Sequence, residues 1–458
     1  MINNEISGEF YDWKKTLKPE RAYLHKYHET LVLKMLLSLP DNKGGSIVYC
    51  NFEEALKRII KLNQITLNVP KIIYLVGWQF NGHDDSYPSW EIVNDNLKRR
   101  EDSCADDSLR WLIKEAKKHH TTVSLHINMT DAYKCSPLWN EYLENNLISK
   151  NIFNKPKKIG KWNGRVAYQI NYKNEYLSGY AQKRIDSLIE RFNLDDVKTI
   201  HIDAFFCRSS IRSKVTIEDE MIFRRKIIRY WRNKGVDVTS EFLYCENGVT
   251  DLIGLVPLVW WINQSENEYL NRPASLICGG KPNRKYKKYK KYLDRMFGKS
   301  IHGEDAWVKQ GTSETNLNWE EEIIEKFCLD TLPFFFLNSL DRIAIIGKGK
   351  EKRVQYSNNF ISYKNKHFIS DGKFILKDGK NVVVPNIFDQ CNSLILYSIE
   401  GYSDRTINLP KEWHQFSEVV FLIDDLKQEI TVKDGQIELS LLPKKMTKLV
   451  TKKSVYYD

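Results

Sequence analysis

Residues 198–206 read KTIHIDAFF, and residues 236–244 read VDVTSEFLY. Each stretch is a strand-like run that ends in a single carboxylate, Asp203 in the first and Glu241 in the second. One helical segment separates them, near residues 218–233. Catalytic groups of a β/α barrel stand at the C-terminal ends of its parallel strands, so a single crossover brings both carboxylates to the same mouth. Such a pair is what cleavage of a glycosidic bond requires.

Strand-like and helical segments alternate over about 300 residues around this pair. An alternation of this length predicts a (β/α)8 TIM-type barrel rather than an open sheet. No G-x-G-x-x-G follows a strand, and no G-x-x-x-x-G-K-[ST] occurs. The chain therefore lacks the glycine-rich loops with which dinucleotide-binding proteins and P-loop NTPases bind phosphate. The strand-like runs lie at 46–50, 71–79, 121–128, 198–206, 236–244 and 255–263, with helical runs at 52–60, 107–118, 176–193 and 218–233 between them.

The secondary-structure pattern of the sequence changes near residue 345. Short alternating strands follow, and two Asp-Gly pairs, at 378–379 and 434–435, predict tight hairpins. A partly amphipathic pattern over residues 20–36 predicts a helix near the N-terminus. We therefore predict an N-terminal helical extension (1–44), a (β/α)8 catalytic barrel (45–345) and an antiparallel β-sandwich domain (346–458).

Bulk composition limits the class of protein. With 458 residues, 42% of them hydrophobic, the chain can form a large domain and a smaller companion. Neither a signal-like start nor an apolar run of about 18 residues is visible, which predicts a cytoplasmic protein that does not span a membrane. The eight scattered cysteines lack C-x-x-C spacing, so we expect no zinc site and no disulfide framework. Cys207 and Cys245 follow the two carboxylates closely and are interpreted as packing residues, because no strand-end histidine partners either thiol.

The net charge of +11 is partly local, because residues 281–292 alternate lysines and an arginine with tyrosines. Such a stretch suits either a patch for nucleic acid or an acidic polymer, or a solvated helix face. The tyrosine spacing favours the helix face. We expect no nucleic-acid partner, and the sequence leaves the oligomeric state open.

Polar clusters follow two further strands of the predicted barrel. His83 and Asp84 come after the strand at 71–79, and His126 and Asn128 come at the end of the next. Charged and amide groups bind sugar hydroxyls in pairs, and tryptophan faces pack on the apolar side of a sugar ring. We therefore interpret these four residues as hydroxyl-binding candidates. Candidate stacking platforms are Trp78, Trp90, Trp162, Trp260 and Trp261.

The order of these motifs resembles the catalytic barrel of the endo-α-N-acetylgalactosaminidases, family 101 of the glycoside hydrolases. The similarity covers roughly residues 45–345, and the β-rich part that follows fits as well. The motifs that carry the resemblance are Gly-His-Asp-Asp-x-Tyr-Pro at 82–88, Ala-Asp-Asp at 105–107, Leu-His-Ile-Asn-Met-Thr-Asp-Ala-Tyr at 125–133, Ile-His-Ile-Asp-Ala-Phe at 200–205 and Val-Thr-Ser-Glu-Phe at 238–242.

This resemblance implies a retaining α-glycosidase acting on α-linked N-acetylgalactosamine, typically the core disaccharide on serine or threonine of mucin-type glycoproteins. Carried over by motif, Asp203 is the nucleophile and Glu241 the general acid/base. Asp84, with His83 and Asn128, binds the sugar in the cleavage subsite, and Trp162 matches an aromatic lining element. The resemblance implies a carbohydrate substrate, no cofactor and no metal.

Two departures from the family pattern leave alternatives open. Family members are usually larger secreted or wall-bound proteins with additional carbohydrate-binding modules. Residues 240–244 read SEFLY where the family usually has Glu-Trp-Gly, so the pocket beside the acid differs. The alternatives are an exo-acting α-galactosidase or α-N-acetylgalactosaminidase, and a non-catalytic glycan- or nucleic-acid-binding protein.

Overall fold

The computed structural model describes residues 11–41, 43–242, 244–246, 248, 252–262, 264–281, 300–303, 306–308, 314–363, 367–370, 374–423 and 426–451. They form two compact units. The first comprises Met1–Ile262, Ala274–Gly279 and His302–Asn316, and the second Asn263–Pro273, Gly280–Ile301 and Leu317–Asp458.

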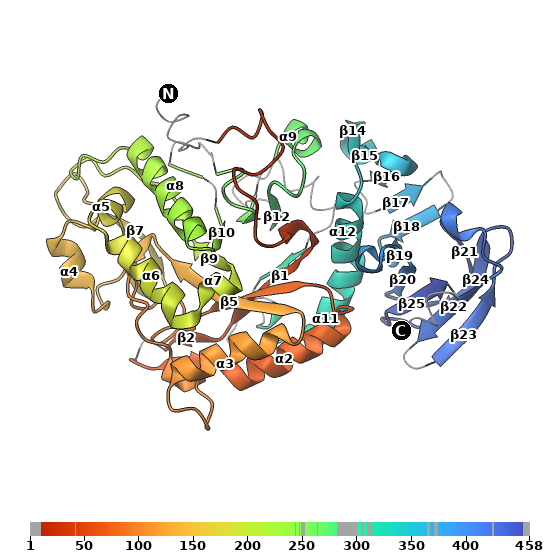
Figure 1. The fold of residues 1–458 in the computed structure, drawn as a ribbon, viewed down its shortest axis with the longest axis horizontal. Helices are drawn as coiled ribbons and strands as arrows, with labels where there is room; N and C mark the ends of the chain where they lie inside the picture. The colour runs from red at the N-terminus through yellow and green to blue at the C-terminus, as the bar shows by residue number, and fades with distance from the viewer. Residues whose placement is uncertain are drawn as a thin grey trace. The chain divides into compact units, whose positions relative to one another are not determined.

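The first unit is built around an eight-stranded sheet whose central strands lie side by side in chain order (Figure 1). The pairs β1–β4, β4–β5, β5–β9, β9–β10 and β10–β11 are all parallel. Parallel strands in chain order, joined by helical crossovers, define a β/α barrel, so the predicted fold class is confirmed. The strands are β1 (Leu31–Leu36), β4 (Lys71–Val76), β5 (Thr121–Asn128), β9 (Thr199–Asp203), β10 (Asp237–Ser240), β11 (Leu258–Trp261), β12 (Cys278–Lys281) and β13 (Ile301–His302).

Burial on both faces explains the composition of the central strands. Every residue of β1 and β4 is buried, as is every residue of β5 except Thr122. Parallel strands covered on both sides read as nearly continuous apolar runs, which is the pattern seen here. Lys34, in the middle of β1, is an exception, and its burial requires a polar partner.

The helices of the first unit lie on the outside of this sheet (Figure 1). Helix α8, the crossover between β9 and β10, begins at a capping box in which Thr216 and Asp219 exchange side-chain and backbone hydrogen bonds. Helix α2 begins in the same way at Asn51 and Glu54. The helical segments are η1 (Tyr27–Glu29), α2 (Phe52–Ile65), η2 (Asp95–Leu97), α3 (Ala105–Lys117), α4 (Trp139–Glu144), α5 (Tyr172–Leu177), α6 (Tyr180–Phe192), α7 (Leu194–Val197) and α8 (Ile217–Asn233).

Two small sheets are added to the barrel. The hairpin β2 (Ser38–Pro40) and β3 (Ser46–Val48) follows β1. The three-stranded sheet β6–β8–β7 is inserted between β5 and α5, and a buried cluster around Trp139 and Tyr142 supports it. Its strands are β6 (Asp131–Ala132), β7 (Lys158–Trp162) and β8 (Arg165–Gln169).

The predicted helix over residues 20–36 is wrong. Tyr27–Glu29 form a single 3-10 turn, and Leu31–Leu36 form β1, which pairs in parallel with β4. A strand that is buried on both faces does not alternate between polar and apolar residues. A short apolar run can therefore be either a buried strand or part of a buried helix. The barrel sheet therefore begins before residue 45, the predicted limit.

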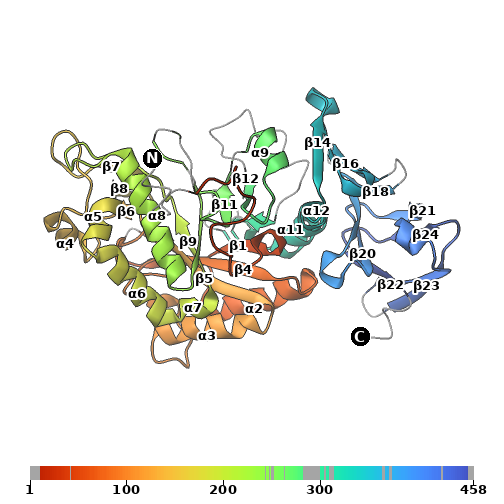
Figure 2. The same ribbon diagram turned by 45° about the horizontal axis from the view of Figure 1, so that its top comes forward.

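The second unit contains the antiparallel part of the fold, as expected for the C-terminal region (Figure 2). Ten strands form one sheet in the order β14-β15-β16-β17-β18-β19-β20-β25-β22-β23, and β21 pairs with β24. The strands are β14 (Arg342–Ile346), β15 (Arg353–Tyr356), β16 (Phe360–Tyr363), β17 (His367–Ser370), β18 (Phe374–Asp378), β19 (Asn381–Pro385), β20 (Ser393–Ser398), β21 (Tyr402–Asn408), β22 (Glu418–Ile423), β23 (Leu426–Thr431), β24 (Gln436–Leu441) and β25 (Thr447–Thr451).

Helical segments of this unit include several short turns. One continuous stretch runs from α11 (Trp319–Lys326) through the π-helical segment η4 (Phe327–Thr331) to α12 (Leu332–Asn338). This stretch belongs to the second unit, whereas the predicted limits placed it in the barrel. The remaining segments are α9 (Glu266–Asn271), η5 (Gly349–Glu351), η6 (Ser357–Asn359), η7 (Ile387–Asp389) and η8 (Lys411–Trp413).

Both predicted Asp-Gly turns are found. Asp378 and Gly379 lie at the turn between β18 and β19, which pair in antiparallel fashion. Asp434 and Gly435 form a tight turn with positive φ that an antiparallel bridge between Lys433 and Gln436 closes, but beyond this bridge β23 pairs with β22 and β24 pairs with β21. A turn signal specifies only the local backbone, and sheet partners are chosen by distant residues.

Two predictions concern other parts of the chain. No helix among the described residues combines the length and apolar character that a membrane crossing needs. Residues 282–299, which hold most of the basic stretch 281–292, lie outside the described residues.

Candidate active site

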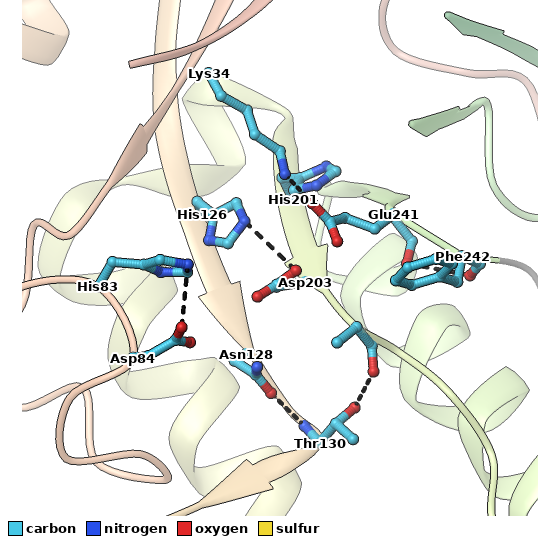
Figure 3. Close-up of polar contacts among 12 residues, drawn as sticks. Lys34, His83, Asp84, His126, Asn128, Thr130, His201, Asp203, Glu241 and Phe242 are labelled. Atoms are coloured by element: carbon cyan, nitrogen blue, oxygen red, sulfur yellow. Dashed lines mark hydrogen bonds and ion pairs between the residues drawn. The ribbon is translucent and has the colours of Figure 1, made fainter. Parts of the chain in front are cut away.

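Asp203 and Glu241 lie together at one edge of the barrel sheet. Asp203 is the last residue of β9, and Glu241 directly follows β10. The two strands are parallel neighbours, with Ile202 opposite Ser240, so both carboxylates emerge at the C-terminal ends of the strands (Figure 3). Their side chains are hydrogen-bonded to each other. The fold therefore brings together the two carboxylates that the sequence pattern indicated.

The two carboxyls differ in how strongly they hold a proton. Burial, and then the neighbouring charge of Glu241, raises the pKa of Asp203 well above its ordinary value. Burial acts in the same direction on Glu241, but the charge of Lys34 and the hydrogen bonds from Asp203 and Lys34 outweigh it and lower the pKa of Glu241. Of the two carboxyls, Asp203 therefore holds a proton more strongly than Glu241. Carboxyls in contact titrate as a pair, because two negative charges cannot be held side by side.

The cation beside this pair is Lys34, which is only 1% exposed. Its ammonium group is hydrogen-bonded to Oε1 of Glu241 (Figure 3). The same group lies 4.7 Å from the centre of the Trp260 ring. A buried ammonium needs a counter-charge, which Glu241 supplies. The sequence pattern did not indicate Lys34, because the predicted helix over residues 20–36 includes it. A signal was present: one lysine interrupts the otherwise apolar run LVLKML at residues 31–36.

Three histidine rings line the same edge. Nε2 of His126 is 3.8 Å from Oδ1 of Asp203, and the His126 ring centre lies 5.2 Å from those of both His83 and His201. Burial, and then the charge of Lys34, lowers the pKa of His126 and His201 well below the ordinary value, so both rings are neutral. Nδ1 of His126 and Nε2 of His201 are buried without a hydrogen-bond partner among the described residues. Neutral imidazoles with an unused nitrogen can bind sugar hydroxyls.

His201 was not among the predicted site residues. It lies two positions before Asp203 on β9, and side chains two apart on a strand share a face. That spacing was the available signal, because a polar residue on the same face as a candidate catalytic carboxylate points into the same space.

His83 and Asp84 lie in a tight loop after β4. Gly82 and Asp84 both have positive φ, and a Cβ at Gly82 would come within 2.7 Å of the backbone of β2, so only glycine fits there. Nε2 of His83 is 3.4 Å from Oδ2 of Asp84. Nδ2 of Asn163, in the turn between β7 and β8, donates to the backbone oxygen of His83 at 3.2 Å and to Oδ2 of Asp84 at 3.4 Å. The inserted sheet thus holds this loop, a role for Asn163 that the sequence did not indicate.

Asn128 completes the set of predicted polar residues. It ends β5 and lies opposite Asp203 in the sheet register. Its Oδ1 accepts hydrogen bonds from the backbone N–H groups of Thr130 and Asp131 at 2.7 and 2.8 Å. Its Nδ2 is buried without a partner among the described residues, which leaves one donor for a ligand.

The predicted tryptophan platforms separate into buried and accessible residues. Trp78 is fully buried, its indole N–H donates to the backbone oxygen of His126 and its ring packs edge-on against Phe192, so its assignment as a stacking platform is wrong. A tryptophan directly after a strand can point into the core as readily as into the mouth. Trp162, on β7, is 48% exposed, and Trp261 is partly exposed. Trp90 and Trp260 are buried.

Histidine and carboxylate side chains at this edge also suit a metal ion by type. The ammonium of Lys34 already occupies Oε1 of Glu241, and its charge acts on the neighbouring histidines and on Asp203. A second cation would be repelled, so we assign no metal ligands here. The groups whose ligand atoms come within 4.8 Å of one another are His83, His126 and Asp203, and His126, His201 and Glu241.

A cavity of about 1250 Å³ lies in the second unit, and all of its lining residues come from the C-terminal part of the chain, between Phe336 and Thr451. Its lining includes Phe336, Asn392, Trp413 and His414. The assignment of the active site therefore rests on the chemistry of the side chains at the barrel edge and not on cavity size.

Comparison with known proteins relates the barrel part of the chain to a family of glycosidases. Residues 35–248 match the family model described as endo-alpha-N-acetylgalactosaminidase, glycoside hydrolase family 101. The match runs from the end of β1 to the segment after β10, and so contains both carboxylates. No curated protein sequence matches the chain.

Among solved structures, the fold is similar to the α-N-acetylgalactosaminidase NagBb from Bifidobacterium bifidum. The ligand-free form aligns with a TM-score of 0.54 and 9% identity, covering 80% of this chain and 62% of that one. A quadruple mutant of the same enzyme aligns with a TM-score of 0.51 and 10% identity, covering 75% and 56%. This chain thus spans about three fifths of the length of those structures, and at such identity the likeness concerns the fold.

A barrel with paired carboxylates at its strand ends is the arrangement that glycoside hydrolases use. Over residues 35–248 the chain is similar to family 101 of that class.

Proposed function

We propose that the chain is a retaining α-glycosidase that hydrolyses α-linked N-acetylgalactosamine, with Asp203 as nucleophile and Glu241 as general acid/base. The hydrogen bond between these two carboxyls carries the proposal. Retaining enzymes place the pair about 5–5.5 Å apart, whereas inverting enzymes need about 6.5–9.5 Å to admit a water molecule. Carboxyls in direct contact leave no room for that water, which supports retention.

The unequal proton affinities of the pair support the same division of roles. The first step needs an ionised nucleophile and a protonated acid, hence one proton on the pair. In the free protein Asp203 holds this proton more strongly, so attack on the anomeric carbon requires its transfer to Glu241 along the existing hydrogen bond. In the second step Glu241 removes a proton from the water that attacks the glycosyl ester on Asp203. The charge of Lys34 stabilises the ionised Glu241 that this step needs.

The family match and the name of the similar structures support N-acetylgalactosamine as the sugar. His83, Asp84, His126 and Asn128 are proposed to bind its hydroxyls, because they surround Asp203 with neutral and anionic hydrogen-bonding groups (Figure 3). Trp162 and Trp261, the accessible tryptophans of the predicted set, are the proposed stacking residues.

Product analysis tests this proposal. The purified protein is incubated with an aryl α-N-acetylgalactosaminide, an aryl α-galactoside and a mucin-type glycopeptide carrying the core disaccharide. We expect cleavage of the first and the third, with the α-anomer as the first product by NMR. Free disaccharide indicates endo action and free monosaccharide exo action, and preference for the galactoside would favour an α-galactosidase. A β-anomer as the first product, or no cleavage of any glycoside, would contradict the proposal.

Asp84 provides a test of sugar recognition. Asp84 is mostly buried beside His83 and can accept strong hydrogen bonds from hydroxyls. Hydrogen bonds to a charged group contribute about 1.5–3 kcal/mol, so Asp84→Asn is expected to lower kcat/KM by about 10- to 150-fold. Asp85→Asn is the matched control, because Asp85 pairs with Arg165 at 3.1 Å. Equal losses in steady-state kinetics of the two variants would argue against a role of Asp84 in binding the sugar.

Lys34 provides a test of the proton balance. Its positive charge lowers the pKa of both Asp203 and Glu241, so Lys34→Met is expected to raise both. Activity requires one proton on the pair, and both limbs of the pH profile of kcat/KM should therefore move to higher pH, by about one to two units. Lys34→Arg keeps the charge and should keep the profile. The surrounding His83, His126, His201 and Asp84 are unchanged in both variants, and an unmoved profile in a folded Lys34→Met protein would refute this electrostatic role.

A further inference from the structure

Two cysteines lie side by side just beyond the catalytic carboxylates. Cys207 follows Asp203 by four positions, and Cys245 follows Glu241 by four. The two cysteines form a parallel β-bridge, and the backbone N–H of Glu246 donates to the carbonyl of Cys207 at 3.0 Å. Bridged strands lie about 4.7–4.9 Å apart, inside the Cα separation of about 4.4–6.8 Å that a disulfide spans. The backbone thus already has the spacing of a cross-link.

The two sulfur atoms are chemically unequal. The thiols of Cys207 and Cys245 are close enough for each to act on the pKa of the other. Nη2 of Arg224 also donates to Sγ of Cys245, at 3.1 Å, and Nη1 donates to the backbone oxygens of Phe205 and Tyr244. Because of the hydrogen bond from Cys207 and the charge of Arg224, the pKa of Cys245 is lowered, whereas burial raises that of Cys207. A thiolate beside a thiol is the arrangement from which disulfides form.

We propose that Cys207 and Cys245 are a redox-active dithiol that closes to a disulfide across the two loops following the catalytic strands. The geometric basis is the β-bridge between the two cysteines and the hydrogen bond from Arg224 to Sγ of Cys245. Both side chains are buried, 0% and 2% exposed, so a small oxidant such as a peroxide is the reagent class that reaches them.

The chemistry balances with hydrogen peroxide as the two-electron oxidant. The thiolate of Cys245 attacks one peroxide oxygen, the O–O bond breaks, and hydroxide leaves, which gives a sulfenic acid at Cys245. The sulfur of Cys207 then attacks the sulfenyl sulfur, the S–O bond breaks, and the departing hydroxide takes the proton of Cys207 as water. A thiol reductant reverses the reaction by thiol–disulfide exchange.

Peptide mapping tests the proposal directly. The experiment uses the full chain with the three exposed cysteines, Cys104, Cys135 and Cys391, each replaced by serine, so that their oxidation does not interfere. After treatment with hydrogen peroxide, alkylation and digestion with trypsin and a Glu-specific protease, we expect residues 199–208 linked to residues 242–246, since each peptide holds one cysteine. The thiol content of the denatured protein should fall by two, and Tm should rise by several degrees because a long loop is closed. Dithiothreitol should restore both values.

Single substitutions provide the controls. Cys207→Ser and Cys245→Ser should abolish the linked peptide and the rise in Tm, while Cys328→Ser, at another buried cysteine, should leave both unchanged. Absence of the linked peptide after prolonged oxidation of the native protein would overturn the proposal. So would conversion of Cys245 to a sulfinic acid with Cys207 still reduced. None of these readouts depends on glycosidase activity, so the test is independent of the proposed function.

Discussion

Replacing Asp203 by asparagine is expected to reduce kcat on an aryl α-N-acetylgalactosaminide by about 10⁴-fold or more, with the fold intact. The amide has nearly the same shape as the carboxyl but cannot attack the anomeric carbon, so no glycosyl-enzyme intermediate forms. The amide can still donate a hydrogen bond to Glu241, as the protonated Asp203 does, which preserves the local packing. Steady-state kinetics, with circular dichroism to verify folding, measures the effect.

The matched control is Asp237→Asn. Asp237 is also a buried aspartate, but it is the first residue of β10, at the opposite end of the sheet, where its side chain accepts a hydrogen bond from the N–H of Leu24. Its loss is expected to lower stability and to leave kcat unchanged. Turnover by Asp203→Asn close to that of the unmodified protein would remove Asp203 from the mechanism.

Replacing Glu241 by glutamine is expected to slow turnover by about 10²- to 10⁴-fold on substrates with poor leaving groups. Such substrates need a proton on the departing oxygen, and the neutral amide of the variant has no acidic proton to give. An activated aryl leaving group departs without that proton, so glycosylation should stay fast while deglycosylation becomes limiting, and both kcat and KM should fall. Rates across a series of aryl leaving groups measure this dependence.

Azide separates the roles of the two carboxylates. It attacks the intermediate without help from a base, so it should restore turnover of Glu241→Gln on an activated substrate and yield an α-glycosyl azide. Glu220→Gln is the control, because Glu220 is a buried acid that accepts hydrogen bonds from the backbone of Tyr172 and Lys173. Rescue that instead gives the β-azide from Glu241→Gln would mean that Glu241 is the nucleophile.

Sequence patterns predicted the barrel well because they depend on local order. Strands and helices alternate along the chain, and β4, β5, β9, β10 and β11 lie in the sheet in that same order. The C-terminal ends of parallel strands meet at one edge, so the positions of Asp203, Glu241, His126 and Asn128 at strand ends followed from the pattern. Family motifs then suggested their roles.

The sequence pattern failed at positions where burial or contacts with distant residues determine the local structure. The run containing Lys34 fits a helix and a buried strand equally, and only its pairing with β4 distinguishes them. Trp78 was expected at the mouth, yet it is in the core against Phe192. The turn at Asp434 was correct, but its flanking strands found partners in different sheets.

The two acid-tipped strands could be recognised from the amino-acid order alone, because strand periodicity and strand-end position are properties of neighbouring residues. The protonation of the pair could not, because it depends on Lys34, which lies 207 positions from Glu241. The contact between Cys207 and Cys245 likewise exists only because β9 and β10 are adjacent in the sheet. Electrostatic and sulfur chemistry act over a few ångströms, and residues so far apart in the chain reach that range only after folding.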